Sequence, residues 1–264
     1  MIDLIFIDVD GTLVGSSGEV ASTTWEAAAR TRAAGVRLAV CSGRPAFGLA
    51  RGHAERLDGD GWHVFQNGAS VVRLPAGPTR SRGLAPAAMT SLVARARGTG
   101  RALELYADSE YAVETDTPRT REHAKLLGVR WAPRDLLSLH GPVVRGQWLV
   151  SHAEAKVVMA EPHDGLNLSH SLSPLMADTS FINITSAGVD KALAVRAVAA
   201  EYDIPLARAM MVGDGANDVT AMQAVGFAVA MGNAEAGAKA VAGYEVSHVD
   251  RGGLAEALAL ALTL

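Results

Sequence analysis

Short apolar runs alternate with helix-like segments at both ends of this chain, and this alternation is the strongest constraint on its fold. Near the N-terminus, strand-like runs at residues 2–7, 36–40 and 63–65 are separated by helical stretches. Near the C-terminus, runs at 209–212 and 227–231 alternate with helical stretches at 189–202, 217–225 and 234–242, and a last helix starts at about residue 254. Strands separated by helices pair in parallel, with the helices on the sheet faces. Both ends therefore predict one α/β core with a Rossmann-like parallel sheet and helices on both faces.

The middle of the chain follows a different pattern. Pro75, Gly77, Pro78 and Gly83 mark its start, and short helices then mix with strand-like segments such as 111–115 and 147–150. Such a mixture is typical of an α+β unit rather than of a continued parallel sheet. We therefore expect a core domain made of residues 1–82 and 181–264, with a second domain of residues 83–180 inserted into it.

Composition narrows the class of protein. Of the 264 residues, 49% are hydrophobic and 20% charged, which predicts a packed core. The net charge of −4 gives no basic face for nucleic acid. The single cysteine, Cys41, excludes an internal disulfide framework and a multi-cysteine zinc site, and it fits a reducing compartment. The apolar runs at 4–7 and 254–264 are too short to span a bilayer, and the first has no basic start typical of a signal peptide. We expect a cytoplasmic protein without a membrane or nucleic-acid partner; nothing in the sequence indicates its oligomeric state.

Two carboxylates follow the first strand, in the segment Asp-Val-Asp-Gly-Thr at residues 8–12. Asp8 and Asp10 are two residues apart, so both can point to the same side of an extended segment, and Gly11 lets backbone approach a ligand. This pattern fits a nucleophile and a proton donor, although a polar strand-end turn is an equal alternative for the motif alone. A calcium loop of the EF-hand type is disfavoured, because Leu13 occupies the position that requires glycine.

A second polar segment, Ser42-Gly43-Arg44, ends the second strand. A hydroxyl and free backbone N–H groups at a helix entrance can bind phosphate oxygens, but an ordinary helix cap explains the segment as well. The neighbouring Cys41 lacks a cysteine–histidine signature and is interpreted as a buried structural residue.

Two further segments lie in the C-terminal half. Lys191 begins a helix, and Gly-Asp-Gly-Ala-Asn-Asp at 213–218 follows a strand. Asp214, Asn217 and Asp218 offer oxygens of the kind that a hard cation prefers. Ligands of an open parallel sheet bind outside the carboxyl ends of its strands, so all these segments can meet at one edge.

Taken in order, segments 8–12, Ser42, Lys191 and 213–218 resemble the four motifs of the haloacid dehalogenase superfamily of phosphotransferases. The Ser-Gly-Arg at 42–44, the Gln-Asn-Gly-Ala at 66–69 and the segment 213–218 resemble its Cof-type branch. One helix and one strand occupy residues 9–41, so an inserted domain fits only between Ser42 and Lys191. That interval is the type II cap position of the superfamily, and the mixed elements within it resemble a type IIB cap.

The resemblance implies a magnesium-dependent phosphatase that passes through an aspartyl-phosphate. Asp8 is the implied nucleophile and Asp10 the implied acid and base, while Lys191 and Ser42 bind the transferring oxygens. The residues implied to hold Mg²⁺ are Asp8, Asp10 through its backbone carbonyl, Asp214 and Asp218. Magnesium would offset the repulsion between the carboxylate of Asp8 and an anionic ester.

The remaining implied roles concern the substrate and its surroundings. Asn217 and Asp218 are implied to orient Lys191 or metal-bound water. Gly43, Arg44 and Asn67 are implied to contact the substrate or the nucleophile loop. The implied partner is a small phosphorylated metabolite, and sugar phosphates, phosphoglycolate-like acids and flavin or pyridoxal phosphates all remain open.

Two other functions stay open at this point. A phosphosugar mutase shares the aspartyl-phosphate and also occurs with a type IIB cap. A catalytically silent binding module on the same fold is disfavoured, because every catalytic position of the motifs is filled.

Overall fold

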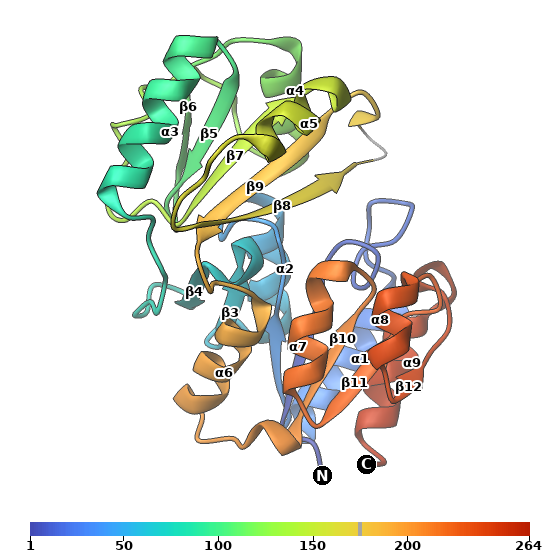
Figure 1. Ribbon diagram of the computed structural model, residues 1–264. Helices are drawn as coiled ribbons and strands as arrows, with labels where there is room; N and C mark the ends of the chain where they lie inside the picture. Colours follow the sequence, from blue (N-terminus) through green and yellow to red (C-terminus); the bar gives the residue numbers. More distant parts are fainter. Residues whose placement is uncertain (174–175) are drawn as a thin grey trace. The chain divides into compact units, whose positions relative to one another are not determined.

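The computed structural model describes residues 1–173 and 176–264, and the chain divides into two compact units (Figure 1). The core unit comprises Met1–Arg44, Ala50–Arg80 and Asp190–Leu264. The inserted unit comprises Pro45–Leu49 and Ser81–Val189.

The core unit contains a five-stranded parallel sheet with the order β12-β11-β10-β1-β2. Its strands are β1 (Leu4–Ile7), β2 (Arg37–Val40), β10 (Ala209–Gly213), β11 (Phe227–Ala230) and β12 (Tyr244–Glu245). All four residues of β1 are buried, as expected for a central strand covered on both faces. Ile7 lies opposite both Val212 and Val40, so these three strands end at the same level.

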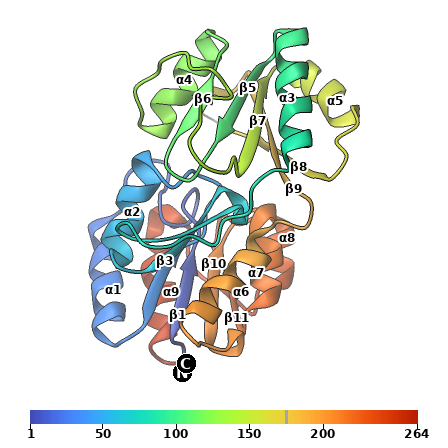
Figure 2. The ribbon, with the colours of Figure 1, turned by 90° about the vertical axis from the view of Figure 1, so that its left-hand side faces the viewer.

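Helices cover both faces of this sheet, as the sequence predicts. Helices α1 (Ser22–Ala33) and α9 (Gly253–Ala261) pack together on one face, while α6 (Lys191–Glu201), α7 (Val219–Ala224) and α8 (Ala236–Val241) lie on the other (Figure 2). The core unit also holds most of α2 (Gly48–Asp58) and the short 3₁₀ turns η3 (Leu206–Arg208) and η5 (Val249–Arg251). Leu4 and Phe6 pack against Val195 and Val198 of α6. The α/β prediction for this part of the chain is confirmed.

The third N-terminal strand differs from the prediction. Strand β3 (Trp62–Phe65) pairs antiparallel with β4 (Ser70–Arg73), through the turn η1 (Gln66–Gly68), and not with the five-stranded sheet as a regular member. A single parallel bridge, Cys41 to Val64, joins it to the end of β2. At this edge the ring of His63 meets β2, because its Nδ1 accepts the backbone N–H of Val40 at 3.0 Å in place of a ladder bond.

The inserted unit is an antiparallel sheet with the order β6-β5-β7-β9-β8. Its elements are α3 (Pro86–Thr99), β5 (Ala102–Tyr106), β6 (Tyr111–Val113), α4 (Pro118–Leu127), β7 (Arg145–Val150), α5 (His152–Ala160), β8 (Leu166–Leu172) and β9 (Ser180–Ser186). Helices α3 and α5 bury an apolar face around Trp148, and α4 packs with Phe181 on the other face. The α+β character expected for this region is therefore observed.

The second boundary of the inserted unit lies later than the expected residue 180. Strand β9 pairs with β7 and β8 over residues 180–186, so this stretch belongs to the inserted sheet and not to the core. The core unit resumes at Asp190, directly before α6.

In the described part of the chain, no helix combines the length and apolar character needed to cross a bilayer.

His63 makes the stability of the core unit depend on pH. Its Nε2–H donates to the backbone carbonyl of Asp58 at 2.8 Å and its Nδ1 accepts from Val40, so the buried ring is neutral. Burial lowers the pKa of His63 from 6.5 to about 4. Between pH 6.5 and about pH 4, His63 is therefore protonated in the unfolded chain but not in the folded one. Its contribution to the free energy of unfolding is fully present above pH 6.5 and is lost as the pH falls towards 4.

We predict that the free energy of unfolding, measured in urea, falls between pH 7 and pH 4 by about 3 kcal/mol more in the wild type than in His63→Gln. His140→Gln serves as the matched control, because the His140 side chain is 90% exposed. This control should keep the wild-type pH dependence. An equally steep loss in His63→Gln would show that the buried imidazole is not responsible.

Candidate active site

The site lies where the parallel strands of the core unit end. Asp8 follows β1 and Asp214 follows β10, while Ser42 comes two residues after β2. Because β10, β1 and β2 are neighbours that end at one level, the three side chains are gathered at one edge. The core unit thus places these three motif residues at the edge of the sheet where ligands of such sheets bind.

A buried ammonium group joins two of the expected carboxylates. Lys191 is the first residue of α6, and its Nζ donates to Asp8 Oδ1 at 2.7 Å and to Asp218 Oδ1 at 2.6 Å. The Lys191 side chain has no exposed surface. Burial alone would lower the pKa of Lys191, but the charges of Asp218 and Asp8 outweigh burial and raise it. The amine is therefore a permanent cation.

Asp8, Asp214 and Asp218 bring carboxylate oxygens within 4.8 Å of one another. Burial, followed by the charge of Asp218, raises the pKa of Asp214 to about 7, and burial raises the pKa of Asp8 as well. When all three carboxyl groups are ionised, they and the ammonium of Lys191 together carry two excess negative charges. The all-oxygen donor set and this excess charge fit a divalent hard cation such as Mg²⁺.

Asp218 is fully buried and is fixed by the loop that carries it. Its Oδ2 accepts the backbone N–H groups of Asp214 and Gly215, both at 3.0 Å, and its Oδ1 accepts from Lys191. These bonds close the 3₁₀ turn η4 (Ala216–Asp218) before α7. Asp218 thus contacts Lys191 directly.

The side chain of Asp10 lies apart from the three-carboxylate group and pairs with Arg44. Arg44 donates through Nε to Asp10 Oδ2 at 2.8 Å and through its terminal nitrogen to Oδ1 at 2.5 Å. This two-pronged contact fixes the plane of the Asp10 carboxylate. The backbone N–H of Arg44 also donates to Ser42 Oγ at 3.1 Å. Arg44 therefore connects the loop that carries Asp10 with the loop that carries Ser42.

Asn67 and Asn217 meet although 150 residues separate them. Asn217 Nδ2 donates to Asn67 Oδ1 at 3.0 Å. Gly43 lies against the same amide, because a Cβ at this position would stand 3.1 Å from Asn67 Oδ1. Asn67 and Asn217 thus contact one another within the core unit, while Lys191 donates to Asp8 and Asp218 and not to Asn217.

Two residues that sequence reasoning missed also hold Asp214. Thr12 donates through Oγ1 to Asp214 Oδ1 at 3.1 Å. Asn233 donates through Nδ2 to the carbonyl of Gly11 at 2.8 Å and to Asp214 Oδ2 at 3.3 Å. Asn233 follows β11 by three residues, so the rule that ligands gather at the carboxyl ends of parallel strands could have identified it.

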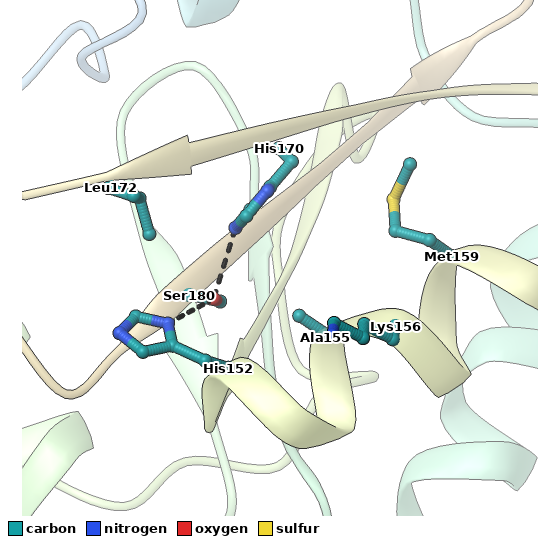
Figure 3. Close-up of a pocket in the computed structure, with 7 residues that line it drawn as sticks. All are labelled: His152, Ala155, Lys156, Met159, His170, Leu172 and Ser180. Carbon is teal, nitrogen blue, oxygen red and sulfur yellow. Dashed lines mark hydrogen bonds between the residues drawn. The ribbon is translucent and has the colours of Figure 1, made fainter.

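A separate hollow of about 410 Å³ lies in the inserted unit, between α5 and strands β8 and β9 (Figure 3). His152 Nδ1 and His170 Nε2 both point to Ser180 Oγ, at 2.8 and 3.0 Å. Among the described residues that line it, Lys156 is the only cation with a fixed charge and none is a carboxylate. Its lining gives no cation site comparable to that of the core unit.

The chain belongs to the haloacid dehalogenase-like hydrolases, because the sequence model of that family matches residues 5–258. It is 25% identical to the HMP-PP phosphatase of Yersinia pseudotuberculosis over 89% of this chain and 85% of that protein. A solved haloacid dehalogenase-like hydrolase from Bacteroides thetaiotaomicron superposes with a TM-score of 0.85 at 25% identity, over 98% of this chain and 99% of that one.

The fold with its inserted sheet also matches a solved structure of the cap type expected from the sequence. A subclass IIB sugar phosphatase of the superfamily superposes with a TM-score of 0.82 over 99% of this chain and 100% of that one, at 20% identity. This likeness shows the fold. The family model and the curated relatives together identify the chain as a phosphatase of this superfamily.

Proposed function

We propose that the protein is a magnesium-dependent phosphatase that hydrolyses a small phosphate monoester through an aspartyl-phosphate on Asp8. The observation that carries this proposal is the buried contact between Lys191 and Asp8 inside the three-carboxylate group. A permanent cation beside a carboxylate at the strand ends provides a place for an anionic group to meet a nucleophile.

In the first half of the reaction, Asp8 attacks the phosphorus atom of the ester. An Asp8–phosphorus bond forms, and the bond between phosphorus and the leaving oxygen breaks. Lys191 and the Ser42 hydroxyl bind the phosphoryl oxygens as their charge redistributes. Asp10 gives its proton to the leaving oxygen, so the leaving group departs as an alcohol.

In the second half, Asp10 takes a proton from the attacking water, and the acyl phosphate is cleaved to free Asp8 and phosphate. Arg44 keeps the Asp10 carboxylate in one plane through its two hydrogen bonds and favours its ionised form, which is the form that takes the proton from water. Gly43 belongs to the Ser42 loop, and Asn67 lies against it from the turn after β3. Both are assigned to the surroundings of the phosphoryl group.

Asp8, Asp214 and Asp218, together with the backbone carbonyl of Asp10, are the groups that would hold Mg²⁺. When bound, magnesium supplies charge that offsets the repulsion between the carboxylate and the anionic ester. Thr12 and Asn233 fix the orientation of Asp214 through hydrogen bonds to both of its oxygens.

We assign the inserted unit, whose main segment is Ser81–Val189, to selection of the ester. A sugar phosphate or a similar small metabolite is the proposed substrate, supported by the relatives that act on sugar phosphates and on HMP-PP. A cytoplasmic location is proposed with it, because such metabolites and Mg²⁺ are both present there and Cys41 is a free, buried thiol.

We predict that Asp8→Asn abolishes turnover, because an amide is a poor acceptor for a phosphoryl group. Release of phosphate from a small aryl phosphate in the presence of Mg²⁺ should fall at least about 10³-fold. Circular dichroism should show an unchanged fold. Asp164→Asn, a change at an exposed loop residue, should retain the wild-type rate. Turnover by Asp8→Asn near the wild-type rate would exclude Asp8 as the nucleophile.

We also predict that Asp214→Ala weakens Mg²⁺ binding more than Ser42→Ala does. Asp214 contributes a charged ligand to the cation, whereas Ser42 addresses the phosphoryl group. Calorimetric titration of Mg²⁺ should give a dissociation constant at least about tenfold higher for Asp214→Ala, with Ser42→Ala close to the wild type. Equal affinities of the two variants would place the cation elsewhere.

A further inference from the structure

The turn that follows β3 has an unusual backbone. Gln66, Asn67 and Gly68 all have positive φ, at 53°, 55° and 96°. In the described chain only one other non-glycine residue, Asp203, shares this conformation. L-residues rarely adopt it because the Cβ meets the neighbouring carbonyl, and two in succession persist only where surrounding contacts enforce them.

The backbone of this turn holds the Ser42 loop in place. Gln66 donates its backbone N–H to the carbonyl of Arg44 at 2.9 Å, and Asn67 donates its own to the carbonyl of Ser42 at 3.0 Å. The loop that carries the phosphate-binding hydroxyl therefore rests on two consecutive hydrogen bonds from left-handed residues.

The end of the turn lies against the start of α6. A Cβ added to Gly68 would stand 2.1 Å from the carbonyl oxygen of Asp190, the residue that caps α6 directly before Lys191. Only glycine permits this approach. The turn therefore contacts both the Ser42 loop and the start of α6, and so fixes the position of Lys191 relative to that loop.

The side chain of Asn67 completes the arrangement. Its Oδ1 accepts from Asn217 Nδ2, in the loop that also carries Asp214 and Asp218. One turn of three residues therefore touches the Ser42 loop, the start of the Lys191 helix and the Asp214–Asp218 loop, three segments far apart in sequence.

We propose that Asn67 is a positioning residue, which acts on the phosphoryl group through Asn217 and the Ser42 loop rather than by binding the substrate itself. This inference rests on the proposed phosphatase function, since it assigns how that site is kept in register. Asparagine suits the position because it tolerates the left-handed backbone and supplies a side-chain acceptor.

A double-mutant cycle separates positioning from direct contact. Asn67→Gly keeps the left-handed backbone and removes the amide, and it is combined with Asn217→Ala. The kcat and KM for a small aryl phosphate are measured at saturating Mg²⁺. If Asn67 acts through Asn217, Asn67→Gly lowers kcat by about tenfold or more in the wild type and causes little further loss in Asn217→Ala.

Two controls exclude a general loss of structure. The unfolding midpoint of Asn67→Gly should equal or exceed that of the wild type, because glycine relieves the left-handed strain. Asp203→Gly makes the matched change at a left-handed residue outside this turn, in the loop after α6, and should leave kcat unchanged. A lowered unfolding midpoint in Asn67→Gly, together with a loss of kcat in Asp203→Gly, would show that Asn67 serves only the stability of the fold.

Binding of inorganic phosphate to the same four proteins, measured by calorimetry with Mg²⁺ present, gives a readout that does not depend on turnover. Positioning predicts that phosphate affinity falls in Asn67→Gly and that the loss is absent in the Asn217→Ala background. Losses that multiply in the double variant, or no loss in Asn67→Gly, would overturn the inference. A wild type that hydrolyses no ester would refute the proposed function, while the phosphate cycle would still decide the role of Asn67.

Discussion

The buried ammonium of Lys191, held between Asp8 and Asp218, is the interaction on which the site depends. Burying one cation with two carboxylates is favourable only when the geometry is close and the remaining oxygens are hydrogen-bonded. Here the contacts are 2.7 and 2.6 Å, and the other oxygen of Asp218 accepts two backbone N–H groups. A single side chain thereby joins the loop after β1, the start of α6 and the loop after β10.

The crowding of carboxylates explains where glycine is required. A Cβ on Gly11 would stand 2.2 Å from Asp214 Oδ2, and one on Gly213 would stand 2.5 Å from Asp218 Oδ2. Both loops can approach so closely only without side chains at these positions. Burial, and after it the charge of Asp218, raises the pKa of Asp214, and a divalent cation would offset the cost of keeping this carboxylate ionised.

Much of this arrangement could be predicted from the sequence, because it follows from the order of elements. Asp8, Lys191 and Asp214 each lie at a strand end or helix start, and parallel strands bring such ends to one edge. The partners of Asn67 and Asn233 could not be predicted in the same way, since they depend on loop conformations that no periodicity encodes. Likewise, the pairing of β3 with β4 depends on the conformation of the turn between them, and the later boundary of the inserted unit follows from the long-range pairing of β9.

The most direct test of the central claim is to trap the phosphorylated enzyme in Asp10→Asn. A nitrophenyl phosphate needs no protonation of its leaving group, so the first half of the reaction should proceed while hydrolysis of the intermediate is blocked. The account predicts a burst of about one equivalent of nitrophenolate per enzyme, with a hydroxylamine-sensitive phosphoryl group on the peptide that contains Asp8. Absence of the burst together with an unmodified Asp8, or phosphorylation of a different residue, would contradict it.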